Sequence, residues 1–280
     1  MENQHRPIER TKSRRLADEF GWTRSSYTLL SIFLATIFLL TYVWWPLAEE
    51  YLEQIDVSQS LWRQIDWLLI GIFLAMSALI MAGADIRQDA WILVVGLAGG
   101  LVIESWGTQT ELWTYYTLER PPLWIIPAWP IASLSIDRLV RISDRFVRNG
   151  DGSRWTVVSY WLVFPAFMGL MLFFVWPTID KPLTIAALVL CAALILTPTN
   201  HRLAIVTFAA GAGLGFLLEY WGTTRLCWTY YTGQTPPVFA VFAHGMAAVA
   251  FWRTGLLLRQ LAARRSITAP SRDGLWTNQL

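Results

Sequence analysis

The sequence predicts an all-α, polytopic membrane bundle of about eight transmembrane helices in two parallel four-helix repeats. Three observations predict it: 55% of the residues are hydrophobic and only 15% are charged, the apolar residues occur in long blocks, and one motif occurs twice. Apolar runs that cross roughly 30 Å of hydrocarbon, at about 1.5 Å per helical residue, indicate membrane spans. The expected spans are 26–47, 67–84, 90–104, 122–139, 155–176, 182–198, 203–220 and 237–258.

Basic residues predict the orientation of these spans. With an even number of spans both termini share one side, and that side holds 18 of the 22 Lys and Arg residues. Cytoplasmic loops carry an excess of basic residues, so we expect both termini in the cytoplasm and the protein in the bacterial inner membrane. The basic clusters are therefore topology signals that also contact membrane lipids, and the net charge of +2 does not indicate a nucleic-acid partner.

The same basic segments divide the chain. We expect a basic cytoplasmic segment at 1–25, a first four-helix repeat at 26–140 and a basic cytoplasmic linker at 141–154. A second four-helix repeat follows at 155–258, and a cytoplasmic tail at 259–280. The first span is too long and too far from the N-terminus for a cleaved signal peptide, so we expect it to stay as a membrane helix.

The repeat is clearest around two acidic residues. When Arg87–Arg138 is laid over Arg202–Arg253 at a constant offset of 115, 17 of 52 positions match. An even number of spans in each repeat places both copies in the same orientation, so we expect a pseudo-two-fold axis along the membrane normal with the two motifs at one depth. Small residues permit close helix packing, which we expect at six glycines. These are Gly96, Gly99, Gly100, Gly211, Gly213 and Gly215.

Each motif copy combines one carboxylate with aromatic and hydroxyl side chains. A carboxylate at the end of an apolar helix either pairs with a donor or holds a proton, and a proton-holding Glu can act as a general acid. Glu104 and Glu219 are the candidate acids, and aromatic π faces beside them would shelter a cation. The candidate substrate-binding residues are Trp106, Thr108, Trp113, Tyr115, Tyr116 and Trp129 in the first copy, and Trp221, Thr223, Trp228, Tyr230 and Tyr231 in the second.

The two copies differ at one chemically important position. His244 stands where the first copy has Trp129, and it is the only His well inside an expected span. We expect it either to relay a proton to Glu219 as a third catalytic residue or to serve as a hydrogen-bonded structural partner.

Several other site classes find no support in the sequence. The chain has two cysteines, which indicates neither a disulfide framework nor a Cys metal site. It lacks a His pair at ligand spacing, a GxxxxGK[ST] loop and a GxSxG elbow. We therefore expect no metal and no cofactor.

At Glu104, Gly107-Thr108, Trp113, Tyr115-Tyr116-Thr117, Pro121-Pro122 and Trp129 the sequence resembles the membrane carotenoid-biosynthesis family. That family includes the carotenoid 1,2-hydratases and bisanhydrobacterioruberin hydratase. The resemblance implies an enzyme acting on a polyene or prenyl lipid, by acid-catalysed hydration or cyclisation. The segment PPLWIIPAWP also resembles the Pro- and Trp-rich segment of tryptophan-rich sensory proteins, which bind tetrapyrroles and sterols.

Two alternatives stay open at this point. The same aromatic residues could line the site of a protein that binds or transports a hydrophobic ligand without catalysis, with structural or proton-coupled Glu residues. They could also belong to the aromatic belt of an assembly or scaffold protein, because Trp and Tyr are enriched at membrane interfaces.

Overall fold

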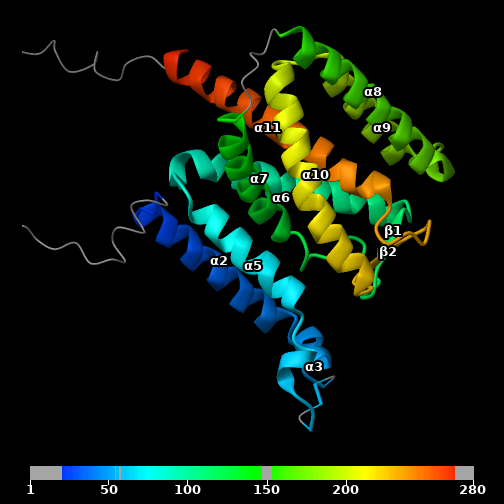
Figure 1. Cartoon of the computed structure of the whole chain (residues 1–280). Coiled ribbons are helices and arrows are strands. Elements are labelled where there is room, and N and C mark those ends of the chain that lie inside the picture. Colours follow the sequence, from blue (N-terminus) through cyan, green and yellow to red (C-terminus); the bar gives the residue numbers. More distant parts are fainter. Residues whose placement is uncertain (1–20, 54, 57, 147–152, 269–280) are drawn as a thin grey trace, which may run out of the picture.

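The computed structural model describes residues 21–53, 55–56, 58–146 and 153–268, and these residues are predominantly helical (Figure 1). Most of the expected N-terminal segment, the middle of the expected linker and the end of the expected tail lie outside the described residues. The helices and strands are α2 (Arg24–Val43), α3 (Trp45–Glu53), α4 (Leu61–Gln64), α5 (Trp67–Met81), α6 (Ile86–Gln109), β1 (Trp113–Tyr115), α7 (Ala128–Asp144), α8 (Arg154–Val175), η1 (Trp176–Thr178), α9 (Pro182–Leu196), α10 (His201–Thr224), β2 (Trp228–Tyr230) and α11 (Val238–Thr268).

Five helical segments among the described residues are long and apolar enough to cross a membrane. They are α2, α6, α8 with its continuation η1, α10 and α11. The helices α5 and α9 are apolar but shorter, at 15 residues each. Each expected span overlaps at least one helix, and the first, 26–47, covers most of α2 and the start of α3. The count of eight membrane crossings stays a prediction.

Helix boundaries follow from capping residues and prolines. Asp66 caps α5 by accepting from the amides of Leu68 and Leu69, and Asp85 caps α6 in the same way. Proline occupies the first position of α9, where its missing N–H costs nothing. The helix α7 begins at Ala128, six residues later than expected, because three prolines between 121 and 127 disfavour helix there.

Four helices form the centre of the molecule, with α2 and α5 on one side and α8 and α9 on the other (Figure 1). In the centre α6 packs on α7 and α11, and α10 packs on α11 and α7. The α6–α7 pair of the first expected repeat therefore packs against the α10–α11 pair of the second.

Glycines explain how closely the central helices pack. A Cβ at Gly96 would lie 2.8 Å from Pro130 Cα, and a Cβ at Gly211 would lie 2.8 Å from the carbonyl oxygen of His244. Gly99, Gly100 and Gly215 also contact side chains of neighbouring helices, as expected. The expectation is wrong for Gly213, which is exposed and has no atom within 4 Å of where its Cβ would be.

The offset of 115 residues that relates the two motifs also relates the bounds of several elements. Adding 115 to the bounds of α5, α6 and β1 gives the bounds of α9, α10 and β2. The first helices do not follow this offset, because the connection from α2 to α5 holds α3 and α4 whereas the connection from α8 to α9 holds only η1.

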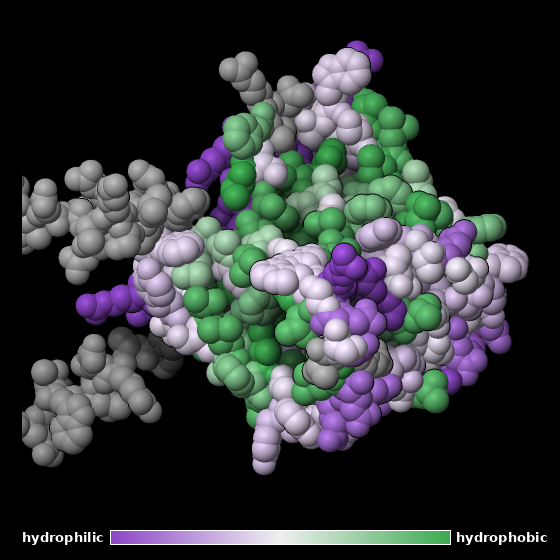
Figure 2. Space-filling model, turned by 60° about the horizontal axis from the view of Figure 1, so that its bottom comes forward, coloured by the Kyte–Doolittle hydropathy of each residue, from purple (hydrophilic) through white to green (hydrophobic). Residues whose placement is uncertain are grey.

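The strands β1 and β2 were not expected in an all-α chain, and they form a two-stranded antiparallel sheet. They connect the two WTYYT segments near the ends of α6 and α10 (Figure 1). Viewed from that end, hydrophilic residues extend from the middle of the face to its lower and right-hand edges, and hydrophobic residues cover broad areas above and to the left of the centre (Figure 2). The helix α11 also runs to Thr268, ten residues beyond the expected boundary of the second repeat.

Candidate functional site

The ends of α6 and α10 turn the chain in the same way. After α6 the amide of Leu112 donates to the carbonyl of Gly107 at 2.9 Å, and the equivalent pair after α10 is also 2.9 Å apart. This is the hydrogen-bond pattern of a Schellman motif, which places one residue in the left-handed conformation. Glu111 and Leu226 adopt it, at φ 64° and 55°. Neither residue is glycine, so both turns contain a strained backbone position.

Each turn brings a Trp ring back onto its own helix. Trp113 lies on Gly107 and Trp228 lies on Gly222, so closely that a Cβ at either glycine would overlap the indole ring. Glycine is therefore required in each WGT triplet. As a result, the indole N–H of each strand reaches the Glu one helical turn before that glycine.

The strand pair joins the two motif copies through equivalent residues. Trp113 lies opposite Tyr230, Thr114 opposite Thr229, and Tyr115 opposite Trp228. The centre of the ladder is therefore the threonine pair, whose hydroxyl oxygens are 3.2 Å apart. Trp and Tyr rings from opposite strands approach with centroids 5.7 to 5.8 Å apart, so each copy supplies aromatic walls to the other.

Glu104 is buried and accepts hydrogen bonds from two indoles. Trp113 Nε1 donates to Oε2 at 3.0 Å, and Trp129 Nε1 donates to Oε1 at 3.1 Å. Tyr115 also interacts with this carboxyl group. With 4% of Glu104 exposed, both oxygens are satisfied inside the protein.

Glu219 is equally buried but has different partners. Trp228 Nε1 donates to Oε2 at 2.9 Å, as its counterpart does in the first copy. The other oxygen, Oε1, lies 2.9 Å from the hydroxyl of Tyr230 and 2.9 Å from His244 Nε2. The replacement of Trp129 by His244 therefore exchanges an indole for an imidazole at the same position beside the acid.

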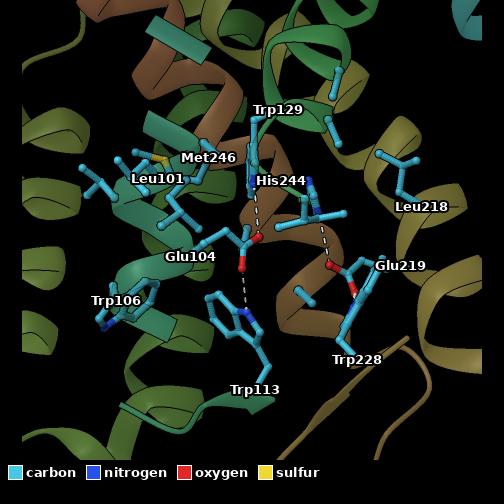
Figure 3. A pocket seen from close by; sticks show the side chains of 18 of the residues that line it. Leu101, Glu104, Trp106, Trp113, Trp129, Leu218, Glu219, Trp228, His244 and Met246 are labelled. Atoms are coloured by element: carbon cyan, nitrogen blue, oxygen red, sulfur yellow. Dashed lines mark hydrogen bonds and ion pairs between the residues drawn. The ribbon is translucent and has the colours of Figure 1, made fainter. Parts of the chain in front are cut away.

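The rings of Trp129 and His244 stack between the two acids (Figure 3). Their centroids are 5.4 Å apart and their planes differ by 17°. The two carboxyl groups therefore belong to one site, each on its own side of a shared stack (Figure 3).

Basic residues near the motifs pair with other acids. Arg225 Nε lies 3.0 Å from Asp66 Oδ2, and Arg120 Nη1 lies 2.8 Å from Glu111 Oε1. The hydrogen bond and charge of Arg120 lower the pKa of Glu111. Burial alone would raise the pKa of Asp66, but its hydrogen bonds and the charge of Arg225 outweigh this effect, so the pKa lies below its ordinary value of 3.8. An ion pair of Glu104 or Glu219 with Arg120 or Arg225, one possible structural role for these acids, does not form.

One further Trp on each of α6 and α10 donates a hydrogen bond to the opposite repeat. Trp106 Nε1 on α6 donates to Thr184 Oγ1 near the start of α9, at 3.2 Å. Trp221 Nε1 on α10 donates to Asp66 Oδ2 at the start of α5, at 2.8 Å. Both rings also line the cavity described next.

A cavity of about 790 Å³ surrounds the two acids. Besides Glu104, Glu219 and His244, its walls include seven of the sequence-predicted aromatic residues: Trp106, Trp113, Tyr115, Trp129, Trp221, Trp228 and Tyr230. Nearly all other wall residues are apolar. The arrangement therefore provides two buried acids in a largely hydrocarbon-like pocket of the size that small-molecule ligands occupy.

Four sequence-predicted residues do not reach this cavity. Thr108 and Thr223 are buried and donate to the carbonyls of Glu104 and Glu219 at 2.6 Å, so their hydroxyls are satisfied within α6 and α10. Tyr116 and Tyr231 are 48% and 46% exposed. Each directly follows its strand and continues the alternation by which successive side chains lie on opposite faces.

The sequence interpretation missed the walls contributed by the outer helices. Ile72 and Met76 of α5, Phe167 of α8, and Leu190 and Cys191 of α9 line the cavity. Their signal was only general hydrophobicity. The 115-residue offset, applied beyond the motif, relates Ile72 to Ala187 and Met76 to Cys191 and would have paired these walls.

Among the described residues, no group of three or more His, Cys, Asp or Glu side chains is arranged to hold a metal ion. No protein-family model, curated protein or solved structure matches this chain. The resemblance to membrane carotenoid-biosynthesis proteins therefore stays a prediction from the motif residues.

Proposed function

We propose that the protein is an integral membrane enzyme of isoprenoid or carotenoid metabolism that protonates a carbon–carbon double bond, leading to hydration or cyclisation. The observation that carries this proposal is the contact of one oxygen of the buried Glu219 with both His244 and Tyr230, at 2.9 Å each. The contacts join an acid to two groups that can exchange a proton with it, inside an apolar cavity.

The hydrogen-bond partners of the two acids differ, which supports different roles for them in the proposed mechanism. An indole N–H can only donate, so neither Trp113 nor Trp129 can exchange a proton with Glu104. A hydroxyl and a neutral imidazole can donate or accept. Glu219 can therefore regain a proton through His244, whereas Glu104, on the other side of the Trp129–His244 stack, has an indole at the equivalent position.

The proposed reaction uses no redox partner. Glu219 transfers its proton to one alkene carbon, and the other carbon becomes a cation beside the aromatic rings, which attract positive charge. In hydration a water oxygen attacks the cation and then returns one proton to the carboxylate, which gives an alcohol and restores the acid. In cyclisation a second double bond attacks the cation and closes a ring. A carbon next to the new cation then loses a proton to the carboxylate, which restores the acid.

The membrane arrangement is part of the proposal. We propose eight spans, two parallel repeats and cytoplasmic termini in a bacterial inner membrane. The distribution of basic residues supports the orientation. The constant offset between element bounds, together with a strand ladder centred on Thr114 and Thr229, supports the duplication.

A protein that binds or transports a hydrophobic ligand without catalysis is the second candidate. It is favoured by the complete hydrogen bonding of both Glu residues, because satisfied polar groups can be structural components of a binding site. This candidate uses the same cavity and requires no proton transfer.

The test compares Glu219→Gln and Glu104→Gln with Glu111→Gln, which alters an exposed acid outside the cavity. Each purified variant is checked for yield and thermal midpoint and then incubated with an acyclic polyene such as lycopene in deuterated water. Deuterium bound to carbon in the products reports protonation of an alkene directly. We expect Glu219→Gln to lose at least 100-fold in rate, within the usual contribution of a general acid, and Glu111→Gln to behave as wild type.

If well-folded Glu219→Gln and Glu104→Gln variants form product at the wild-type rate, the acid-catalysis proposal is wrong. The ligand-binding protein is then the better-supported candidate. His244→Gln gives a second comparison, because it retains hydrogen-bonding capacity but cannot supply a proton. We expect His244→Gln to lower the rate, because Glu219 then regains its proton without the imidazole at 2.9 Å.

A further inference from the structure

The cavity walls divide into two sets that lie on different helices. One set belongs to α5, α7 and α10 and includes Ile72, Met76, Ala132 and Leu218, which pack in one hydrophobic cluster. The other belongs to α6, α9 and α11 and includes Ile103, Ala187, Cys191 and Met246, which belong to a second cluster. We call the space beside the first set the α5 lobe and the space beside the second set the α9 lobe.

The two lobes are equivalent under the 115-residue offset. Ile72 corresponds to Ala187, Met76 to Cys191 and Ile103 to Leu218, and each of these six residues lines the cavity. Ala132 corresponds to Ala247 and Ala128 to Ala243, so these wall positions carry the same residue in both lobes.

The acids and the Trp129–His244 stack lie between the lobes. Glu104 lies on the side of Leu101 and Met246, and Glu219 lies on the side of Leu218 (Figure 3). The polar groups are thus central, whereas the described ends of both lobes consist mainly of aliphatic and aromatic side chains, such as Phe73 and Leu194.

We infer that the ligand is an elongated hydrocarbon chain that crosses from one repeat to the other, with one apolar segment in each lobe and its interior beside the two acids. Apolar walls favour apolar ligand surface, and a polar group placed deep in either lobe would be buried without a hydrogen-bond partner. The volume of about 790 Å³ lies high in the usual range for small-molecule pockets and accommodates such a chain. This inference rests on the proposed isoprenoid ligand and deepens it, because it places the reacting bond inside the chain with apolar substituents on both sides.

The matched alanines provide a test in which each lobe is the control for the other. Ala132→Trp fills the α5 lobe and Ala247→Trp fills the α9 lobe. Ala128→Leu and Ala243→Leu form a second, milder pair that keeps the test available if a Trp variant does not fold. Folding is checked by elution as a single species in detergent and by the thermal midpoint.

The probes are radiolabelled squalene, a C30 isoprenoid hydrocarbon without a polar end, and farnesol, a C15 isoprenoid alcohol. We expect the wild-type protein to retain squalene. A larger side chain in either lobe, which we call a plug, should weaken squalene retention at least tenfold. Farnesol is short enough to occupy one lobe, so neither plug alone should remove its binding.

Loss of squalene retention from only one plug of a folded pair would overturn the inference, and so would a wild-type protein that retains farnesol but not squalene. These outcomes are independent of catalysis, because they measure binding. If the Gln variants of the acids leave product formation unchanged while both plugs block squalene, the acid-catalysis proposal fails and the two-lobe ligand stands.

Discussion

Asp66 connects the two repeats, and its replacement by Ala should destabilise the protein more than loss of a helix cap alone. Its carboxylate accepts from the amides of Leu68 and Leu69 at 3.1 Å. It also accepts from Trp221 Nε1 at 2.8 Å and pairs with Arg225 at 3.0 Å, both from the opposite repeat. Asp66→Ala removes the cap and the contacts with the opposite repeat together.

Asp85→Ala is the matched control. Asp85 caps α6 through the amides of Arg87 and Gln88 and has no side-chain partner in another helix among the described hydrogen bonds. We expect Asp85→Ala to lower the free energy of unfolding by about 1 kcal/mol, the usual cost of a lost cap. Asp66→Ala should cost about 2 kcal/mol more. Most of this excess comes from the half-buried Trp221 hydrogen bond, because the pair with the 44% exposed Arg225 is screened by solvent.

The assay is unfolding of the purified variants in mixed micelles, followed by circular dichroism at several pH values. The lowered pKa of Asp66 means that its carboxylate stabilises the folded state above the ordinary value of 3.8 and loses this effect as pH falls through the folded-state value. The gap between Asp66→Ala and wild type should therefore shrink in acid. Equal destabilisation by Asp66→Ala and Asp85→Ala at neutral pH would refute the connection between the repeats.

Three further outcomes are expected. Leu226→Gly should raise the free energy of unfolding by about 1 kcal/mol, because Leu226 is 64% exposed and has φ 55°, a conformation that costs a non-glycine residue about this much; a lower thermal midpoint would contradict this reasoning. Gly222→Ala should push the Trp228 ring off Glu219 and lower stability by more than 1 kcal/mol, the lower end of the cost of overpacking, whereas Gly213→Ala, at an open position, should have no such cost in the same unfolding assay. A reporter fused at Arg120 should read external and one fused after Arg145 cytoplasmic; the reverse pattern would rule out the proposed orientation.

The helices were accessible from the sequence because their signal is local. Long apolar runs, caps such as Asp66 and a proline at the start of α9 determine where helices begin and end without reference to the rest of the fold. The strands β1 and β2 were missed because each is three residues long and pairs with a partner 115 residues away. Nothing within either WTYYT segment alone reports that partner.

The sequence predicted most residues of the candidate site, but not the directions in which their side chains point. The acids and most aromatic residues do meet in one cavity. The sequence gives no reason to distinguish Tyr115 from Tyr116, yet only Tyr115 lines the cavity, because successive side chains of an extended segment lie on opposite faces. Thr108 satisfies its own helix instead of a ligand, a choice that depends on its hydroxyl lying four residues after the Glu104 carbonyl.

The difference between Trp129 and His244 has a specific structural meaning. Both are planar rings, so the exchange keeps the stack, with ring planes only 17° apart, and keeps one hydrogen bond to each acid. What changes is the proton chemistry, because imidazole can accept a proton that indole cannot. With an indole in both copies, neither acid would have an imidazole beside it. In the proposed mechanism, the single imidazole beside Glu219 therefore supplies a proton-exchanging group at a position where the first copy has an indole, which cannot accept a proton.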